Sequence, residues 1–96
     1  MRFTLEPASD GVHKWVGVFT DPTTKHERRV PFGAQGYEDY TQHKNHLRQE
    51  NYLLRHRSRE DWSDPQTAGA LSRWLLWDSP SLREAVRKCR RRFSLG

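Results

Sequence analysis

The segment Phe32-Gly33-Ala34-Gln35-Gly36 decides the fold, because the spacing of apolar residues changes across it. Before this segment, apolar and β-branched residues cluster in short runs that are typical of strands. After it, they recur every seventh residue at Tyr40, Leu47 and Leu54, which is a helical register. The spacing of the two glycines matches neither the Walker phosphate-loop pattern nor the dinucleotide-binding fingerprint. The glycines predict a strand-to-helix turn with unusual backbone angles. We therefore expect an α+β fold.

The N-terminal part predicts a small antiparallel meander of about three strands. The candidate strands are Arg2 to Glu6, Val12 to Thr20 and Lys25 to Phe32, which are rich in β-branched and aromatic residues. Between the last two, Asp21-Pro22-Thr23-Thr24 places proline at a turn position and fits a hairpin. Alternate apolar residues of the middle strand point to opposite sides, so we expect both faces of the sheet to be partly covered.

The C-terminal part predicts three to four helices packed on this sheet. A short turn or helix is expected from Tyr37 to His43, and Asn45 is a plausible N-cap for a longer helix that runs to about Ser58. One face of the longer helix is expected to carry Lys44, Arg48, Arg55 and Arg59 with Tyr52 among them, and the opposite face to carry the leucines.

The proline of Trp62-Ser63-Asp64-Pro65 ends that helix, because the residue before a proline disfavours helical angles. Asp64 or Thr67 can cap the next helix, which ends near Trp77 and is apolar enough to be the most buried one. The last helix begins after Ser79 or Ser81, where Ser81 and Glu84 form a capping-box pattern. Its inward stripe is expected to be Leu82, Ala85, Val86, Cys89 and Phe93.

Length and composition allow one core, so residues 1–96 are expected to form one domain with a β-rich part at 1–33 and a helical part at 37–94. Only 33% of the residues are hydrophobic, and 11% are aromatic. We therefore expect large rings to fill much of the core, with the four tryptophans Trp15, Trp62, Trp74 and Trp77 among them.

The single cysteine, Cys89, excludes an internal disulfide and favours a reducing compartment. Its place on the inward stripe predicts a small buried hydrophobic side chain and not a nucleophile. The N-terminal residues lack the apolar run of a secretory signal, and no stretch has the roughly 20 apolar residues of a membrane span. We expect an intracellular protein that does not bind membranes.

Positive charge is concentrated in the last third of the chain. The formal net charge is +5, and residues 67–96 contain seven Lys and Arg against two Asp and Glu. Clustered cations attract phosphates and release counterions, which predicts salt-sensitive nucleic-acid binding. The predicted contact residues are Arg83, Arg87, Lys88, Arg90, Arg91 and Arg92, joined by Lys44, Arg48, Arg55 and Arg59.

Two other interpretations of the basic residues stay open. They can form a solvated helix face, with cations favourably placed near a helix C-terminus. They can also bind an acidic protein surface, as expected of a structural subunit of a larger assembly. No motif of a known nucleic-acid reader is present, so DNA, RNA and protein remain alternatives.

The histidines raise a more remote alternative, a metal-dependent nuclease. His43 and His46 lie three residues apart, with His56, Asp39, Glu60 and Asp61 nearby in sequence. A zinc site requires several such side chains to converge, and neither a paired-cysteine motif nor HExxH supports one. We therefore predict no catalytic residue, no metal and no cofactor.

Two sequence blocks carry a family resemblance: Phe32 to Lys44, and Trp62 to Trp74, with Tyr52 and Arg55-His56-Arg57 between them. With these blocks the chain, from about Trp15 to Phe93, resembles an uncharacterised family of small domains encoded by nucleocytoplasmic large DNA viruses and by some algae or other protists. The resemblance implies a giant-virus or algal setting and a recurring basic tail that ends in an aromatic residue, here Arg90 to Phe93. It implies no activity and no functional residue.

Overall fold

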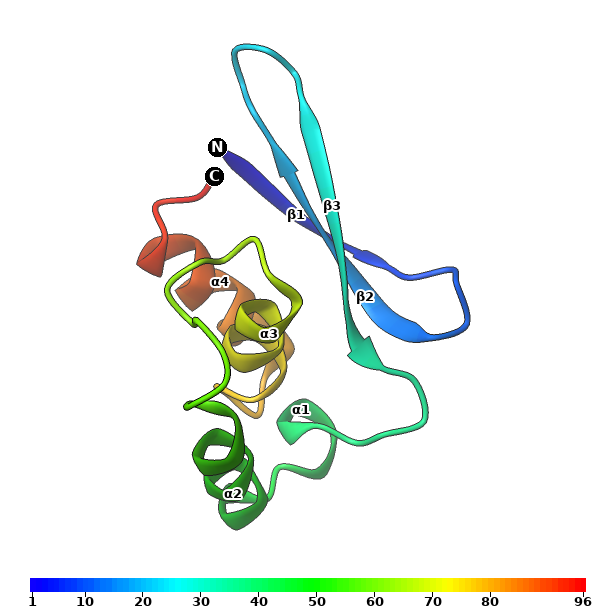
Figure 1. The fold of residues 1–96 in the computed structure, drawn as a ribbon, viewed down its shortest axis with the longest axis vertical. Helices are drawn as coiled ribbons and strands as arrows, with labels where there is room; N and C mark the ends of the chain where they lie inside the picture. Colours follow the sequence, from blue (N-terminus) through cyan, green and yellow to red (C-terminus); the bar gives the residue numbers. More distant parts are fainter.

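A computed structural model describes residues 1–96 and shows a three-stranded sheet followed by helices (Figure 1). The antiparallel sheet has the order β1-β2-β3, which confirms the predicted meander and the α+β fold. Its strands are β1 (Arg2–Pro7), β2 (His13–Thr20) and β3 (Glu27–Ala34). The helical elements are α1 (Tyr40–His43), α2 (His46–His56), α3 (Ala68–Leu71), the π-helix η1 (Ser72–Leu76) and α4 (Leu82–Arg92).

The turns form where the sequence predicts them. The Asp21 side chain accepts hydrogen bonds from the backbone N–H groups of Thr23 and Thr24, which closes the β2–β3 hairpin. At the strand-to-helix turn, Gly33 and Gly36 have φ angles of +77° and +85°, the left-handed region that glycine adopts at low cost. A Cβ atom at Gly33 would also lie 2.9 Å from a Leu76 methyl group. Both the backbone angle and the lack of space therefore require glycine at this position.

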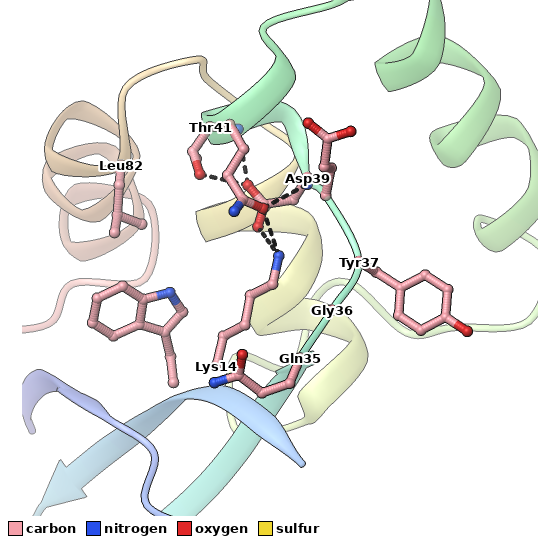
Figure 2. Close-up of a pocket in the computed structure, with 10 residues that line it drawn as sticks. Lys14, Gln35, Gly36, Tyr37, Asp39, Thr41 and Leu82 are labelled. Carbon is pink, nitrogen blue, oxygen red and sulfur yellow. Dashed lines mark hydrogen bonds and ion pairs between the residues drawn. The ribbon is translucent and has the colours of Figure 1, made fainter. Parts of the chain in front are cut away.

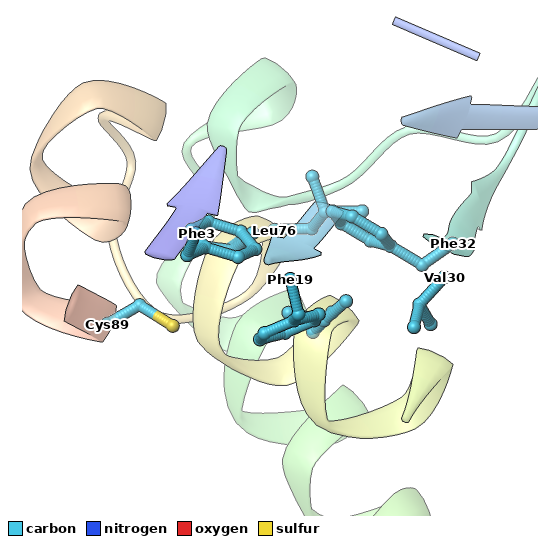
Figure 3. Packing of buried hydrophobic residues seen from close by; sticks show 8 residues of the cluster. Phe3, Phe19, Val30, Phe32, Leu76 and Cys89 are labelled. Carbon is cyan, nitrogen blue, oxygen red and sulfur yellow. The ribbon is translucent and has the colours of Figure 1, made fainter. Parts of the chain in front are cut away.

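The core lies between the sheet and the helices α3, η1 and α4, and phenylalanine and leucine fill it (Figure 3). The fully buried large side chains are Phe3, Phe19, Phe32, Leu71, Leu75, Leu76 and Cys89. The expectation that the tryptophans fill the core is wrong, because all four are only half-buried, and only Trp15, Trp74 and Trp77 pack against its rim. An indole N–H needs a hydrogen-bond partner, and the rim supplies one: Trp74 donates to the Trp62 carbonyl at 2.8 Å.

The outer face of the sheet is covered by its own side chains. Val16 and Val18 are buried on β2, and no helix packs on this face. Glu6 of β1 and Arg29 of β3 form an ion pair of 2.7 Å between the two strands that flank β2. Their long side chains cross the middle strand and shield the two valines, which confirms that both faces are partly covered.

The helix from Ala68 to Leu76 is the most buried one, as predicted. The Thr67 side chain caps it by accepting the Ala70 N–H at 3.2 Å. Its second half widens into a π-turn, in which the Trp77 N–H donates to the Ser72 carbonyl at 3.1 Å. The sequence did not predict this widening, because a π-turn depends on how the helix packs and not on a local signal.

The orientation of α2 differs from the prediction. Asn45 caps the helix as expected, but the expected leucine face is not the buried one, since Leu47 and Leu54 are 65% and 60% exposed. Tyr52 is buried instead, and its ring stacks on Trp77 at 4.1 Å with an interplanar angle of 2°. This tertiary contact, supported by a hydrogen bond from Gln49 to the Trp77 carbonyl, sets which face points inward.

The two chain ends lie side by side (Figure 1). Gly96 donates its N–H to the Met1 carbonyl and accepts the Phe3 N–H, both at 2.9 Å, so the last residues pair with the outer edge of β1. The α4 helix has the predicted Ser81 cap and inward stripe, with Ala85 and Cys89 buried. None of the helices is long and apolar enough to cross a membrane.

Candidate functional site

Three predicted arginines form a row along the exposed face of α4. Arg83, Arg87 and Arg91 are exposed and follow one another at intervals of four residues. At 100° per residue these positions lie within an arc of about 80°, and each step rises by about 6 Å along the helix axis. We call Arg83, Arg87 and Arg91 the α4 arginine row.

Few acidic side chains lie beside the row. Glu84 is the one carboxylate beside it, and the guanidinium of Arg87 donates to this side chain, with Nε at 3.1 Å from Oε2. That hydrogen bond holds the pKa of Glu84 below its ordinary value. Arg83 and Arg91 form no hydrogen bond or ion pair with other side chains, so their N–H groups are free to bind an anion.

The other predicted cations of α4 contact the protein itself. Lys88 lies 2.9 Å from an Asp78 oxygen, and Arg90 donates to the backbone carbonyl of Phe3 at 2.9 Å. Arg92 is exposed, but its guanidinium stacks 3.8 Å from the centre of the Trp74 ring. Arg90, one of the predicted contact residues, is half-buried against β1 and does not point outward.

Asp78 joins α4 to the central helix. Its carboxylate also accepts a hydrogen bond from Arg73 at 3.1 Å, and both of these side chains are largely buried. Burial alone would raise the pKa of Asp78, but hydrogen bonds from Lys88 and Arg73 outweigh it and hold the pKa below the ordinary value. Asp78 and Lys88 therefore hold the structure together and are not free to bind a ligand.

A groove borders the arginine row on the side of β1. It has a volume of about 640 Å³ and is lined by Leu5, Ser81, Leu82, Arg83, Glu84, Val86, Arg87 and Arg90. Its apolar side chains come from β1 and from the inward edge of α4, and its guanidinium groups come from the outward edge. Sequence reasoning missed this groove, because only the fold brings β1 beside α4.

Of the other four predicted cations, Arg48 and Arg55 lie on α2, whereas Lys44 ends α1 and Arg59 follows α2. Lys44 donates to the carbonyls of Thr41 and Pro80, at 3.2 and 2.9 Å. Arg48 pairs with Glu38 at 3.6 Å, and Arg59 is exposed after the end of α2.

A second cleft of about 580 Å³ contains Arg48 and Arg55, together with the stacked rings of Tyr52 and His56. Glu60 also lines this cleft, along with Glu38 and Asp39, so its charge is mixed. The fold therefore brings the cations of α2 and the α4 arginine row to different surfaces.

A third pocket, at the start of the helical part, contains a buried ion pair (Figure 2). Lys14 donates to the carboxylate of Asp39 and to the side chain of Gln42, both at 2.7 Å. The Asp39 side chain also caps α1 by accepting the Thr41 N–H, and the Gln42 side chain accepts the Asp39 N–H. The spacing of Asp39 and Gln42 is a capping-box signal, so the sequence could have shown this start of α1.

The histidines do not converge. No group of three or more His, Cys, Asp or Glu side chains comes close enough to hold a metal ion. His43 Nδ1 accepts the Asn45 N–H at 2.9 Å, whereas His46 Nε2 pairs with Glu50 at 3.1 Å. The convergence that the nuclease alternative requires is not found.

Cys89 is buried on the inward face of α4, as predicted, and its sulfur points into the core (Figure 3). Burial raises the pKa of its thiol to about 11. A thiol with such a pKa is almost entirely protonated at neutral pH, so it is a weak nucleophile.

The fold and the α4 arginine row define a small α+β protein with one basic helix face. A family model described as "Family of unknown function (DUF5754)" matches residues 3–56, so the chain belongs to this family of unknown function. The matched residues contain the sheet, α1 and α2, whereas α3, η1 and α4 follow them. No curated protein and no solved structure matches the chain.

Proposed function

We propose that this protein binds nucleic acid, DNA or RNA, through the α4 arginine row and has no enzymatic role. The observation that carries the proposal is the row itself: three exposed arginines in regular sequence on one helix face, beside a single carboxylate. Guanidinium groups form paired hydrogen bonds with phosphate oxygens, which suits arginine to this task.

The dimensions of the row fit a phosphate backbone. From Arg83 to Arg91 it extends about 12 Å, and phosphates of one strand of a duplex recur about every 3.4 Å along the axis. Three guanidinium groups at this spacing can each contact a different phosphate. Arg92, beside Trp74 at the end of α4, supplies a fourth cation near the row.

The experiment is a salt series of fluorescence-anisotropy binding with labelled duplex DNA, single-stranded DNA and RNA. Three phosphate contacts predict that log K falls with log salt at a slope of about −3 for a duplex. The triple variant Arg83→Gln, Arg87→Gln and Arg91→Gln should lose most of this binding. The charge-matched control changes Lys25, Arg28 and Arg57, exposed cations outside α4, to glutamine. Equal losses of affinity in both variants would mean that the net charge of the protein, and not the α4 arginine row, accounts for the binding.

The setting of this activity follows from the resemblance to giant-virus and algal proteins. We propose an intracellular accessory protein that works in the host cytoplasm or nucleus, or is packed with the genome in the virion. The concentration of positive charge on one helix supports a partner that is itself strongly acidic.

A structural subunit of a larger assembly is the second candidate, and the exposed Leu47 and Leu54 on α2 favour it. Sedimentation of the purified protein over a range of concentrations tests self-assembly. Oligomers that the Leu47→Gln and Leu54→Gln variant no longer forms would support this role. A monomer at every concentration would argue against self-assembly.

A further inference from the structure

The groove between β1 and α4 combines an apolar floor with a basic wall. Its floor consists of Leu5, Leu82 and Val86, which are half-buried and pack against the core. The wall carries the guanidinium groups of Arg83, Arg87 and Arg90 against the one carboxylate of Glu84. A ligand for this groove therefore needs an apolar part and a negative charge next to it.

The outer edge of β1 supplies backbone hydrogen-bonding groups to the same groove. Along an antiparallel edge strand, alternate residues turn their N–H and C=O groups outward. Phe3 is one of them, since its N–H donates to Gly96 and its carbonyl accepts from Arg90. Leu5, two residues further on, faces the same way and lines the groove. Its N–H and C=O offer one donor and one acceptor.

Arg90 closes the end of the groove beside Phe3. Its terminal nitrogen is used by the Phe3 carbonyl, but its Nε is buried and has no hydrogen-bond partner. This nitrogen is closed to solvent, so a ligand in the groove could bond to it only after a shift of the Arg90 side chain. The groove therefore presents the backbone donor and acceptor of Leu5 above an apolar floor.

A peptide strand fits this edge poorly. Strand addition requires outward N–H and C=O groups on several alternate residues. Here Gly96 accepts the N–H of Phe3 and Arg90 donates to its carbonyl, and Pro7 has no N–H, so Leu5 alone remains. A single residue cannot hold an added strand in register.

A nucleobase fits better, because it is flat, has apolar faces and carries donors and acceptors on one edge. In a duplex the faces are stacked and the edges are paired, so only a single strand can offer them. We infer that this groove receives one unstacked base of a single-stranded nucleic acid, while Arg83 and Arg87 hold the adjoining phosphates. This inference rests on the proposed function and narrows its ligand to single strands.

The test compares three labelled oligonucleotides of equal length at one salt concentration: a single strand, the same strand with abasic sites throughout, and a duplex. The wild-type protein should bind the strand with bases about tenfold more tightly than the abasic strand, as expected when roughly 60 Å² of apolar surface is buried on Leu5, Leu82 and Val86. Val86→Phe fills the groove without changing the charge, so it should reduce this ratio to about one and leave the affinity for the abasic strand unchanged.

Val12→Phe is the matched control, since Val12 is exposed and lies outside the groove. It should retain the tenfold ratio, and thermal melting of both variants verifies that they fold. Equal affinity of the wild-type protein for the abasic strand and the strand with bases would overturn the base site and leave phosphate binding by the arginine row intact. Binding of none of the three oligonucleotides would overturn the proposed function itself.

Discussion

Among single residues, Asp78 makes the most consequential ion pairs, since it joins Arg73 of the central helix to Lys88 of α4. Asp78→Ala should lower the free energy of unfolding by about 3 kcal/mol at pH 7, because it leaves largely buried Arg73 without its counter-ion. Urea unfolding measures this loss. Glu50→Ala, which removes an exposed pair with His46, is the control and should cost about 0.5 kcal/mol or less.

The same carboxylate predicts a pH dependence. The pKa of Asp78 is lower in the folded protein than its ordinary value of 3.8, so its ionised form stabilises the fold above that value. This contribution is fully present at neutral pH and is lost as the pH falls below 4 through the lowered pKa. Urea unfolding between pH 6 and pH 3 should therefore show a steeper acid loss for the wild type than for Asp78→Ala. Parallel pH profiles would contradict this role.

Gly17 marks a close approach between the sheet and the central helix. A Cβ atom there would lie 2.8 Å from a Leu71 methyl carbon and 3.1 Å from the Phe3 ring, and both neighbours are fully buried. Gly17→Ala should cost about 2 kcal/mol of stability through overpacking. Combined with Leu71→Ala, it should cost less than the sum of the two single changes, because the second change makes room for the first. Strict additivity in urea unfolding would show that the two residues are not in contact.

The buried thiol of Cys89 predicts a reactivity pattern. With a pKa of about 11, roughly one molecule in a thousand carries a thiolate at pH 8. A chromogenic disulfide reagent should therefore react slowly with the folded protein and rapidly after unfolding in urea. Reaction of the folded protein at the rate of a free thiol would contradict the buried position.

Among the helices and strands, the features that the sequence predicted are those with a local signal, a capping or turn residue close in sequence. The hairpin depends on the Asp21 side chain, and the helix starts at Asn45, Thr67 and Ser81 depend on side chains that bond within three residues. The buried face of α2 has no such signal, because leucine spacing pointed to one face and the stack of Tyr52 on Trp77 selected another. The contact joins residues from separate helices, which periodicity does not reveal.

That contact makes α2 a separately testable element. Tyr52→Ala removes the stacked ring, so the backbone amides of α2 should exchange hydrogen faster while those of α4 keep their protection. Leu47→Ala on the same helix is the control, since Leu47 is exposed, and it should leave the exchange unchanged. Equal acceleration in α2 and α4 would mean that Tyr52 stabilises the whole fold and not the docking of one helix.

At the scale of the whole molecule, the distribution of charge along the sequence located the basic helix, but not its free cations. Arg90 contacts the carbonyl of Phe3, 87 residues away, and Lys88 is held by Asp78. Such long-range pairs follow from the way α4 packs on the sheet and the central helix. The sequence therefore indicated the element of the candidate site, and the fold shows that three of its exposed cations, Arg83, Arg87 and Arg91, form a row, in which Arg87 pairs with Glu84.

The most direct test of this row is an NMR titration that follows the Nε–Hε signals of individual arginines as a single-stranded oligonucleotide is added. We expect the signals of Arg83, Arg87 and Arg91 to shift together and saturate, while those of Arg28 and Arg57 stay in place. Shifts of similar size at all exposed arginines, or shifts confined to α2, would contradict a binding surface on α4.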